Sequence, residues 1–202
     1  FKNKKILLNK KLFKKDFVDR LIFNLKKVNS FIVHDKYQMI DKLWINRPME
    51  EKNKIFKLKN NLSGCSTKKK INQILKIHNN MDFIIVSSPE SVCWLLNIRG
   101  KDLEYTPIVM SRLILSKNEI KVFVDKSKIK KELFPKYNNF SFYEIESFEK
   151  HLENLPKFCN VYVDQEISYF YFKLLNKKSR NLMLGIDYCK LLKSEKNSLE
   201  IK

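Results

Sequence analysis

The side chains that most often carry out chemistry are few in this chain and stand far apart. The chain has three histidines, His34, His78 and His151, and four cysteines, Cys65, Cys93, Cys159 and Cys189. No two histidines lie at the spacing of ligands on one helix, and no two cysteines have the paired spacing of a zinc or redox site. A chain of 202 residues does not need disulfides to fold. We therefore expect free thiols, and no metal site built on histidine.

The carboxylates do not suggest a metal site either. Hard divalent cations need several converging carboxylates, and the acids that follow predicted strands are expected at unrelated strand ends: Asp125, Asp164, Glu166 and Asp187. No serine or cysteine has a histidine nearby in sequence that would suggest a nucleophile and its base. The sequence thus predicts no catalytic residue and no metal ligand in this chain.

One polar loop, residues 97–107, contains residue types that favour a tight turn. Gly100 is expected to supply a backbone conformation that other residues resist. Arg99 and Asp102 flank it and could pair across a tight turn, and Asn97 could cap the preceding helix or bond its own turn. The simplest interpretation is that the loop only connects a helix to a hairpin.

The net charge of +19 first suggests a nucleic-acid binder. However, the lysines are scattered, and only five of the 41 basic residues are arginines, which dominate base-reading surfaces. The chain contains no alanine and only three glycines, a bias that codons rich in A and T would produce. We therefore favour compositional drift over a polyanionic partner. The lysine-rich segment 2–15 is interpreted as a solvated flank.

Short apolar runs alternate with helical periodicity, which predicts an α/β fold with a mixed β-sheet flanked by helices. We expect strands at residues 5–8, 31–33, 83–86, 140–143 and 161–163, and a hairpin at 108–115 and 120–124. Helices are expected at 16–28, 66–78, 148–155 and 167–175 (the last helical or mixed), after Ser88-Pro89, and from 195 onward. Between residues 37 and 61 the pattern breaks down, and the Lys/Asn-rich stretch after Arg47-Pro48 is expected to be a linker over the surface. His78 is expected to be a satisfied boundary residue, and Trp94 to lie in the core. No apolar run approaches the roughly 18 residues of a membrane helix.

Three motifs in order resemble the three-domain Xaa-Pro aminopeptidases. Residues 94–102 read Trp-Leu-Leu-Asn-Ile-Arg-Gly-Lys-Asp and are followed by Tyr105, Pro107 and Ser111, as in the second creatinase-like domain of that family. Upstream, Asp41, Trp44 and Arg47-Pro48 are similar to its Asp-x-x-Trp-x-x-Arg-Pro element. Residues 193–200 are similar to its linker into the catalytic domain. Departures from the family pattern fall at Glu90, Ser91, Cys93, Lys101, Thr106 and Arg112.

The resemblance implies a creatinase N-terminal-domain-like fold in three parts. Residues 1–36 would be the tail of a preceding creatinase-like domain, 37–192 a second such domain, and 193–202 a linker into an absent catalytic domain of "pita-bread" fold. The start of the chain has neither an initiator methionine nor an apolar signal core, so we expect a piece of a longer protein.

The resemblance also implies a function for the whole protein and a role for this part. The family removes an N-terminal residue that precedes proline, using a dinuclear centre, expected to hold manganese, whose two Asp, one His and two Glu ligands all lie in the catalytic domain. This chain would hold no cofactor, have no activity alone, and wall the cleft. Its partners would be the catalytic domain, the preceding domain, a peptide with proline second, and a second copy in a homodimer.

Within that resemblance, the loop residues Asn97, Arg99, Asp102 and Tyr105 would lie next to substrate, and Arg99 would touch peptide or a neighbouring subunit. The implied location is the cytoplasm, or a degradative vacuolar compartment if a signal precedes the chain. Two alternatives stay open. One is a basic interaction module that has lost catalysis and binds polyanions or acidic partners, although nucleic acid is not expected. The other is a scaffold without substrate contact.

Overall fold

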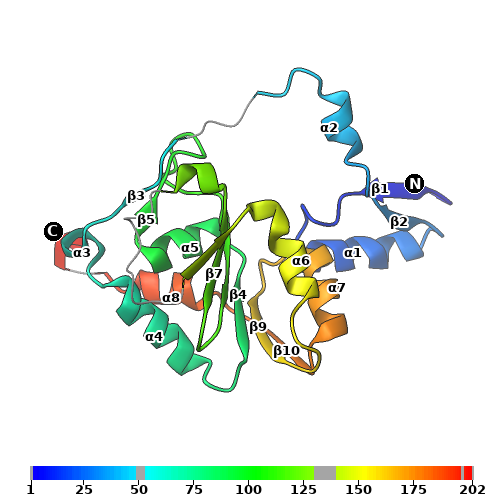
Figure 1. Cartoon of the computed structure of the whole chain (residues 1–202). Helices are drawn as coiled ribbons and strands as arrows, with labels where there is room; N and C mark the ends of the chain where they lie inside the picture. The colour runs from blue at the N-terminus through cyan, green and yellow to red at the C-terminus, as the bar shows by residue number, and fades with distance from the viewer. Residues whose placement is uncertain (1, 49–52, 130–139, 197, 202) are drawn as a thin grey trace.

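A mixed β-sheet is the centre of the fold. The computed structural model describes residues 2–48, 53–129, 140–196 and 198–201. Six strands of these residues form one sheet in the order β10-β9-β4-β6-β7-β8 (Figure 1). They are β4 (Phe83–Val86), β6 (Ser111–Leu115), β7 (Ile120–Val124), β8 (Phe140–Tyr143), β9 (Asn160–Asp164) and β10 (Asn181–Gly185). Neighbours β10, β9 and β4 run parallel, as do β7 and β8, whereas β6 is antiparallel to both β4 and β7.

Helices cover both faces of this sheet. On one face lie α4 (Thr67–Ile77), α5 (Pro89–Leu96) and α8 (Tyr188–Ser194), and on the other lie α6 (Phe148–Glu153) and α7 (Tyr169–Lys178) (Figure 1). Alternate residues of a strand point to opposite faces, so Leu113 joins one apolar cluster and Ile114 the other. Strand β4 has β9 on one side and β6 on the other, and its last three residues are buried. The predicted fold class, a mixed sheet flanked by helices, is confirmed.

The predicted start of α4 is formed by local hydrogen bonding. The Ser66 hydroxyl accepts a hydrogen bond from the backbone N–H of Lys69 at 3.3 Å and so satisfies one unpaired donor of the first turn. Helix α5 begins at Pro89, as predicted, because proline fits the first turn. Ser88 takes the N-cap position there, but its side chain makes no capping bond.

A small unit at the start of the chain lies beside this domain. Strands β1 (Lys5–Leu8) and β2 (Phe31–His34) pair in parallel. Helix α1 (Lys15–Lys26) connects them in the chain, and α2 (Met39–Leu43) follows β2. The unit is attached to the start of α7, where the backbone N–H groups of Tyr169 and Phe170 donate to the carbonyls of Phe13 and Lys10 at 2.9 and 3.1 Å. Figure 1 shows α1 alongside α7. The elements predicted at 5–8, 16–28 and 31–33 are confirmed within two residues.

The lysine-rich flank is more than a solvated tail. Lys11 pairs with Glu149 of α6, and Lys14 pairs with Glu166 in the turn before α7.

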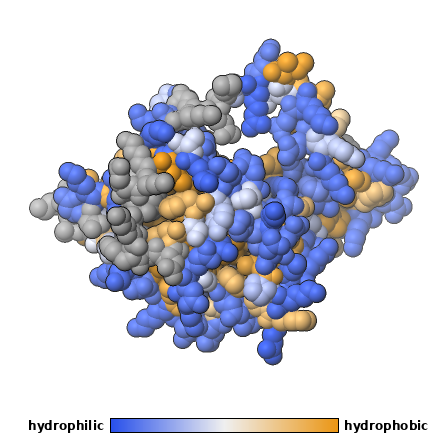
Figure 2. All heavy atoms as spheres, viewed as in Figure 1, coloured by the Kyte–Doolittle hydropathy of each residue, from blue (hydrophilic) through white to orange (hydrophobic). Residues whose placement is uncertain are grey.

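Figure 2 shows a face on which hydrophilic side chains predominate. Among the described residues, no helix has the length and apolar character needed to cross a membrane.

Some elements were not predicted. Strand β10 was missed because it is an edge strand whose side chains are partly or fully exposed. The segment expected as a surface connection contributes β3 (Phe56–Lys57) and α3 (Asn60–Ser63), and β3 pairs with β5 (Ile98–Arg99) at the start of the polar loop. Residues 49–52 of that connection lie outside the described residues. The helix expected from residue 195 appears as α9 (Ser198–Ile201), and residue 202 is likewise not described.

Candidate functional site

Asn97 sits at the end of α5, where it closes the helix. It adopts the left-handed conformation, with φ 54°, and its backbone N–H bonds the carbonyl of Trp94. Its buried side chain donates to the Cys65 carbonyl at 2.8 Å and accepts from the Lys70 ammonium at 2.6 Å. The predicted capping position is confirmed. The side chain is only 1% exposed, so Asn97 positions its neighbours and is covered from solvent.

Arg99 does not pair with Asp102, contrary to one of our interpretations of the sequence. Its Nη1 donates to the carbonyls of Cys93 and Ile98 at 3.1 and 2.8 Å, so the guanidinium folds back onto the end of α5. A cation at a helix C-terminus is favoured because the last carbonyls lack partners within the helix.

Asp102 instead forms a buried ion pair with Lys128. The ammonium and a carboxylate oxygen lie 3.0 Å apart, and both side chains are 4% exposed. The other carboxylate oxygen accepts from the backbone N–H of Met110 at 2.8 Å. The pair therefore holds the polar loop against the turn after β7. Because Lys128 is 26 residues away in sequence, the spacing within the loop gave no sign of it.

Gly100 is required because there is no space for a side chain; it does not have a positive φ, so the expected backbone conformation that other residues resist is not found. The only glycine among the described residues with positive φ is Gly64. A Cβ at position 100 would lie 2.6 Å from Val109 Cγ2 and 3.0 Å from the Ile108 carbonyl oxygen. The loop and the following strand entry approach too closely for any side chain, which is a second standard use of glycine.

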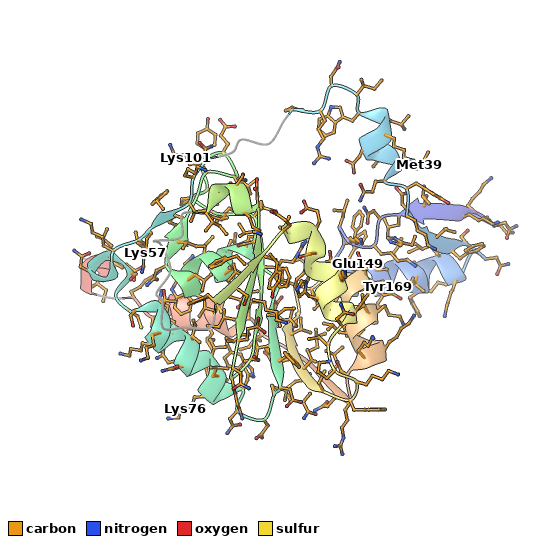
Figure 3. The ribbon with its side chains drawn as sticks, in the orientation of Figure 1. Met39, Lys57, Lys76, Lys101, Glu149 and Tyr169 are labelled. Carbon is orange, nitrogen blue, oxygen red and sulfur yellow. The ribbon has the colours of Figure 1, made fainter. Side chains whose placement is uncertain are left out.

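Tyr105 is the most exposed of the loop residues that we singled out. Its side chain is 96% exposed and its φ is 59°. Lys101, in the same loop, lies beyond the end of the sheet in Figure 3. The structure thus separates the four loop residues: Asn97 and Arg99 lie at the end of α5, Asp102 is buried against Lys128, and Tyr105 faces solvent.

Lys70 is the polar residue that the sequence analysis missed. Its side chain is 1% exposed, and its ammonium donates to the Trp94 carbonyl at 2.9 Å as well as to Asn97. The ammonium lies 4.1 Å from the centre of the Trp94 ring, a cation–π contact. Burial, which penalises the charged form, lowers the pKa of Lys70 to about 8, and the nearby Arg99 charge acts in the same direction. The available signal was its position on the buried stripe of α4, beside Ile71 and Ile74.

Lys70 and Arg99 line one cavity of about 270 Å³ between α4, β5 and the C-terminal segment. Trp94, predicted to lie in the core, is only partly buried and forms part of the wall. The described charged residues around this cavity are five cations and two acids: Lys69, Lys70, Arg99, Lys193, Lys196, Glu195 and Glu200. We call it the Lys70 cavity.

The acids at strand ends do not form a metal site, although two of them are closer together than we expected. Asp164 and Asp187 line one small cavity at the ends of β9 and β10. Asp164 accepts hydrogen bonds from the Ser87 hydroxyl and the Glu166 backbone, and burial raises the pKa of its carboxyl. Asp187 caps α8 and accepts from the Ser91 hydroxyl. Donors from the protein occupy both carboxylates, so they do not fit the open ligand set that a manganese centre needs.

The remaining candidates behave as packing residues. All four cysteines are free, as predicted, and burial raises the pKa of the Cys93 and Cys159 thiols. His78 is not the satisfied residue we expected, because its Nε2 has no hydrogen-bond partner. Its ring contacts the Tyr162 ring in a tilted arrangement, with centroids 3.7 Å apart. Desolvation lowers the pKa of His78. Among the described residues, no group of three or more His, Cys, Asp or Glu side chains could hold a metal ion.

The six-stranded sheet, with Asn97 at the end of α5 and the loop that requires Gly100, forms a creatinase-like N-terminal domain. Residues 46–200 match the family model of the creatinase/prolidase N-terminal domain, and the chain belongs to that family. The chain is 31% identical over 173 residues to Xaa-Pro aminopeptidase ApepP of Drosophila melanogaster, a match that covers 81% of this chain and 28% of that protein. It is 28% identical over 138 residues to Xaa-Pro aminopeptidase 1 of Dictyostelium discoideum, with coverages of 63% and 22%.

A solved structure has the same fold. The X-prolyl aminopeptidase of Caenorhabditis elegans, described as a cytosolic enzyme with a di-nuclear active site, matches all of this chain with a TM-score of 0.87 and 24% identity. The match covers 34% of that enzyme. The chain thus spans about a third or less of the length of these relatives, and it corresponds to the creatinase-like N-terminal region of Xaa-Pro aminopeptidase-like proteins.

Proposed function

We propose that this chain is a non-catalytic domain of an Xaa-Pro aminopeptidase and serves as a wall and spacer beside the catalytic cleft. The observation that carries the proposal is that three of its carboxylates are already bound by other groups of the protein. Asp102 pairs with Lys128, and Asp164 and Asp187 accept protein hydrogen bonds. Carboxylates engaged in this way are poor ligands for a hydrolytic metal pair, which needs open oxygen donors.

The whole protein would be a metal-dependent hydrolase that removes an N-terminal residue preceding proline. The names of its relatives support the reaction, and the di-nuclear active site of the C. elegans enzyme supports the metal chemistry. We place the dinuclear centre, with manganese as its metal, in a catalytic domain that follows this chain. The cytosolic description of the same enzyme supports a cytoplasmic location.

We further propose the domain division 1–36, 37–192 and 193–202. The β1-α1-β2 unit supports the first boundary, because it leaves large apolar side chains exposed, as expected for part of a larger core: Leu7, Phe23, Phe31 and Val33. If the division is correct, limited proteolysis of the whole protein cleaves between β2 and α2, next to residue 36, and separates the β1-α1-β2 unit from the rest. Uniform resistance of that connection would count against it.

The exposed tip of the polar loop is the part that we propose contacts peptide. In the whole protein, Tyr105→Ala should lower kcat/KM for an Xaa-Pro peptide on the order of tenfold, because truncation of a tyrosine that is an interface hot spot costs more than about 1 kcal/mol. The matched control is Tyr37→Ala, which removes a tyrosine that is 68% exposed on a different segment. Unchanged kcat/KM in Tyr105→Ala would mean that the loop only connects a helix to a hairpin. Arg99→Ala tests the inner end of the loop in the same assay.

The alternative of a basic interaction module rests on the net charge alone. Titration with nucleic acid at physiological salt separates the two proposals, since a module that binds polyanions would bind under those conditions. We expect no binding there.

A further inference from the structure

The Lys70 cavity contains two cationic groups whose direct partners, among the described residues, are not carboxylates. Among the described residues, neither Lys70 nor Arg99 takes part in an ion pair with an acid. Their partners are instead backbone carbonyls and the Asn97 side-chain oxygen. Glu195 and Glu200 belong to the cavity lining, but both are exposed.

The end of α5 offsets only part of this charge. Carbonyls of Cys93 and Trp94, in the last turn, accept from Arg99 and Lys70. A helix C-terminus carries the equivalent of about half a negative charge, whereas these side chains bring two full positive charges to it. Buried charges are normally neutralised by a partner because desolvation is costly. The positive charge of the two side chains therefore exceeds the negative charge of the helix end, and this excess favours a bound anion.

Both cationic groups also have more hydrogen-bond donors than the hydrogen bonds given above use. An ammonium has three donors, and Lys70 uses two of them. A guanidinium has five, and the two hydrogen bonds of Arg99 both leave from Nη1. The point charge of a lysine and the planar fork of an arginine together suit an oxyanion, because carboxylate and phosphate oxygens accept several charge-assisted hydrogen bonds.

We propose that the Lys70 cavity binds a small oxyanion, a carboxylate or a phosphate group, held between the Lys70 ammonium and the Arg99 guanidinium. The volume of about 270 Å³ accommodates such a group together with water. Exposed Lys69, Lys193 and Lys196 at the cavity add attraction at its mouth. This inference is independent of the proposed peptidase role, because it concerns side chains of this chain alone.

The test is a titration of the chain with inorganic phosphate at about 0.15 M ionic strength, where exposed charges are screened. We follow the Lys70 side chain by NMR. Saturable binding should raise the pKa of Lys70 above about 8, because a bound anion favours the charged ammonium. Lys70→Met and Arg99→Gln should each weaken phosphate binding at least about tenfold, the usual effect of losing a charge-assisted hydrogen bond.

Lys76→Met is the matched control. It removes the same charge from the same helix, but Lys76 is exposed at the far end of α4 (Figure 3). Its phosphate affinity should equal that of the unchanged chain. No saturable binding, or an equal loss in Lys76→Met and Arg99→Gln, would overturn the proposal. If Lys70→Met fails to fold, Arg99→Gln and the Lys70 titration still decide the question.

A further variant identifies the source of the anion. Glu200 lines the cavity, and its charge acts on Lys70. If the chain's own carboxylate occupies the site, Glu200→Gln should bind phosphate several-fold more tightly. If the site serves a free ligand, Glu200→Gln should bind as the unchanged chain does, and acetate should compete with phosphate. Both results support an oxyanion site, whereas loss of binding in Glu200→Gln would contradict it.

Discussion

Lys128→Met should lower the free energy of unfolding by about 3–5 kcal/mol, the usual cost of removing one partner of a buried ion pair. Lys128 and Asp102 are 4% exposed and 3.0 Å apart, so the variant leaves the Asp102 carboxylate buried without its cation. The measurement is equilibrium unfolding in urea followed by circular dichroism, with the free energy taken by linear extrapolation.

Two controls separate this pair from ordinary surface charge. The double variant Lys128→Met with Asp102→Asn removes both charges but keeps an oxygen that can accept from Met110, so it should recover most of the loss. Asp41→Asn breaks the exposed ion pair between Asp41 and Arg47, in which Oδ1 and Nη1 lie 2.7 Å apart. This substitution should cost less than about 1 kcal/mol. A Lys128→Met cost no greater than that of Asp41→Asn would show that the buried pair contributes little.

Phe123→Ala should destabilise the fold by about 3–5 kcal/mol, because it removes an aromatic side chain from a packed core and leaves a cavity. Phe123 is 0% exposed in β7, and its ring meets the Phe148 ring edge to face with centroids 5.0 Å apart. It joins the sheet to α6, so the loss should affect the whole domain. Unfolding in urea again gives the free energy.

Phe23→Ala is the matched control for Phe123→Ala. It makes the same substitution on α1, where the Phe23 side chain is 63% exposed. Measured on this chain alone, without a preceding domain that would cover Phe23, the change should stay within about 0.5 kcal/mol, as for most surface substitutions. Equal costs for the two variants would mean that the apolar cluster around Phe123 is not the stabilising core of the domain.

The sequence predicted best those elements whose pattern is set by burial. The continuous apolar run of β4 and the stripe of α4 follow from the side chains alone, and both are present. Edge strand β10 has mixed exposure, and β5 is two residues long, so neither leaves a recognisable period. The resemblance to the creatinase-like domain is supported by the match of residues 46–200.

The candidate site was harder to predict because its partners come from distant segments. Arg99 and Asp102 look like a pair in sequence, yet each finds its partners elsewhere, in the end of α5 and in Lys128. Lys70 is one of many lysines, and only its place on a buried stripe marks it. The need for Gly100 comes from the close approach of Val109. Such contacts depend on tertiary packing, which residue spacing does not encode.

The most direct test of the central claim is a peptidase assay of the pure chain with Arg-Pro-Pro in the presence of Mn²⁺, run beside the whole protein that contains it. We expect release of the N-terminal arginine by the whole protein and none by the chain above the rate without protein. Release by the chain that requires Mn²⁺ and stops on chelation would show that hydrolytic machinery lies within these residues, and the assignment of this domain as a wall and spacer would be wrong.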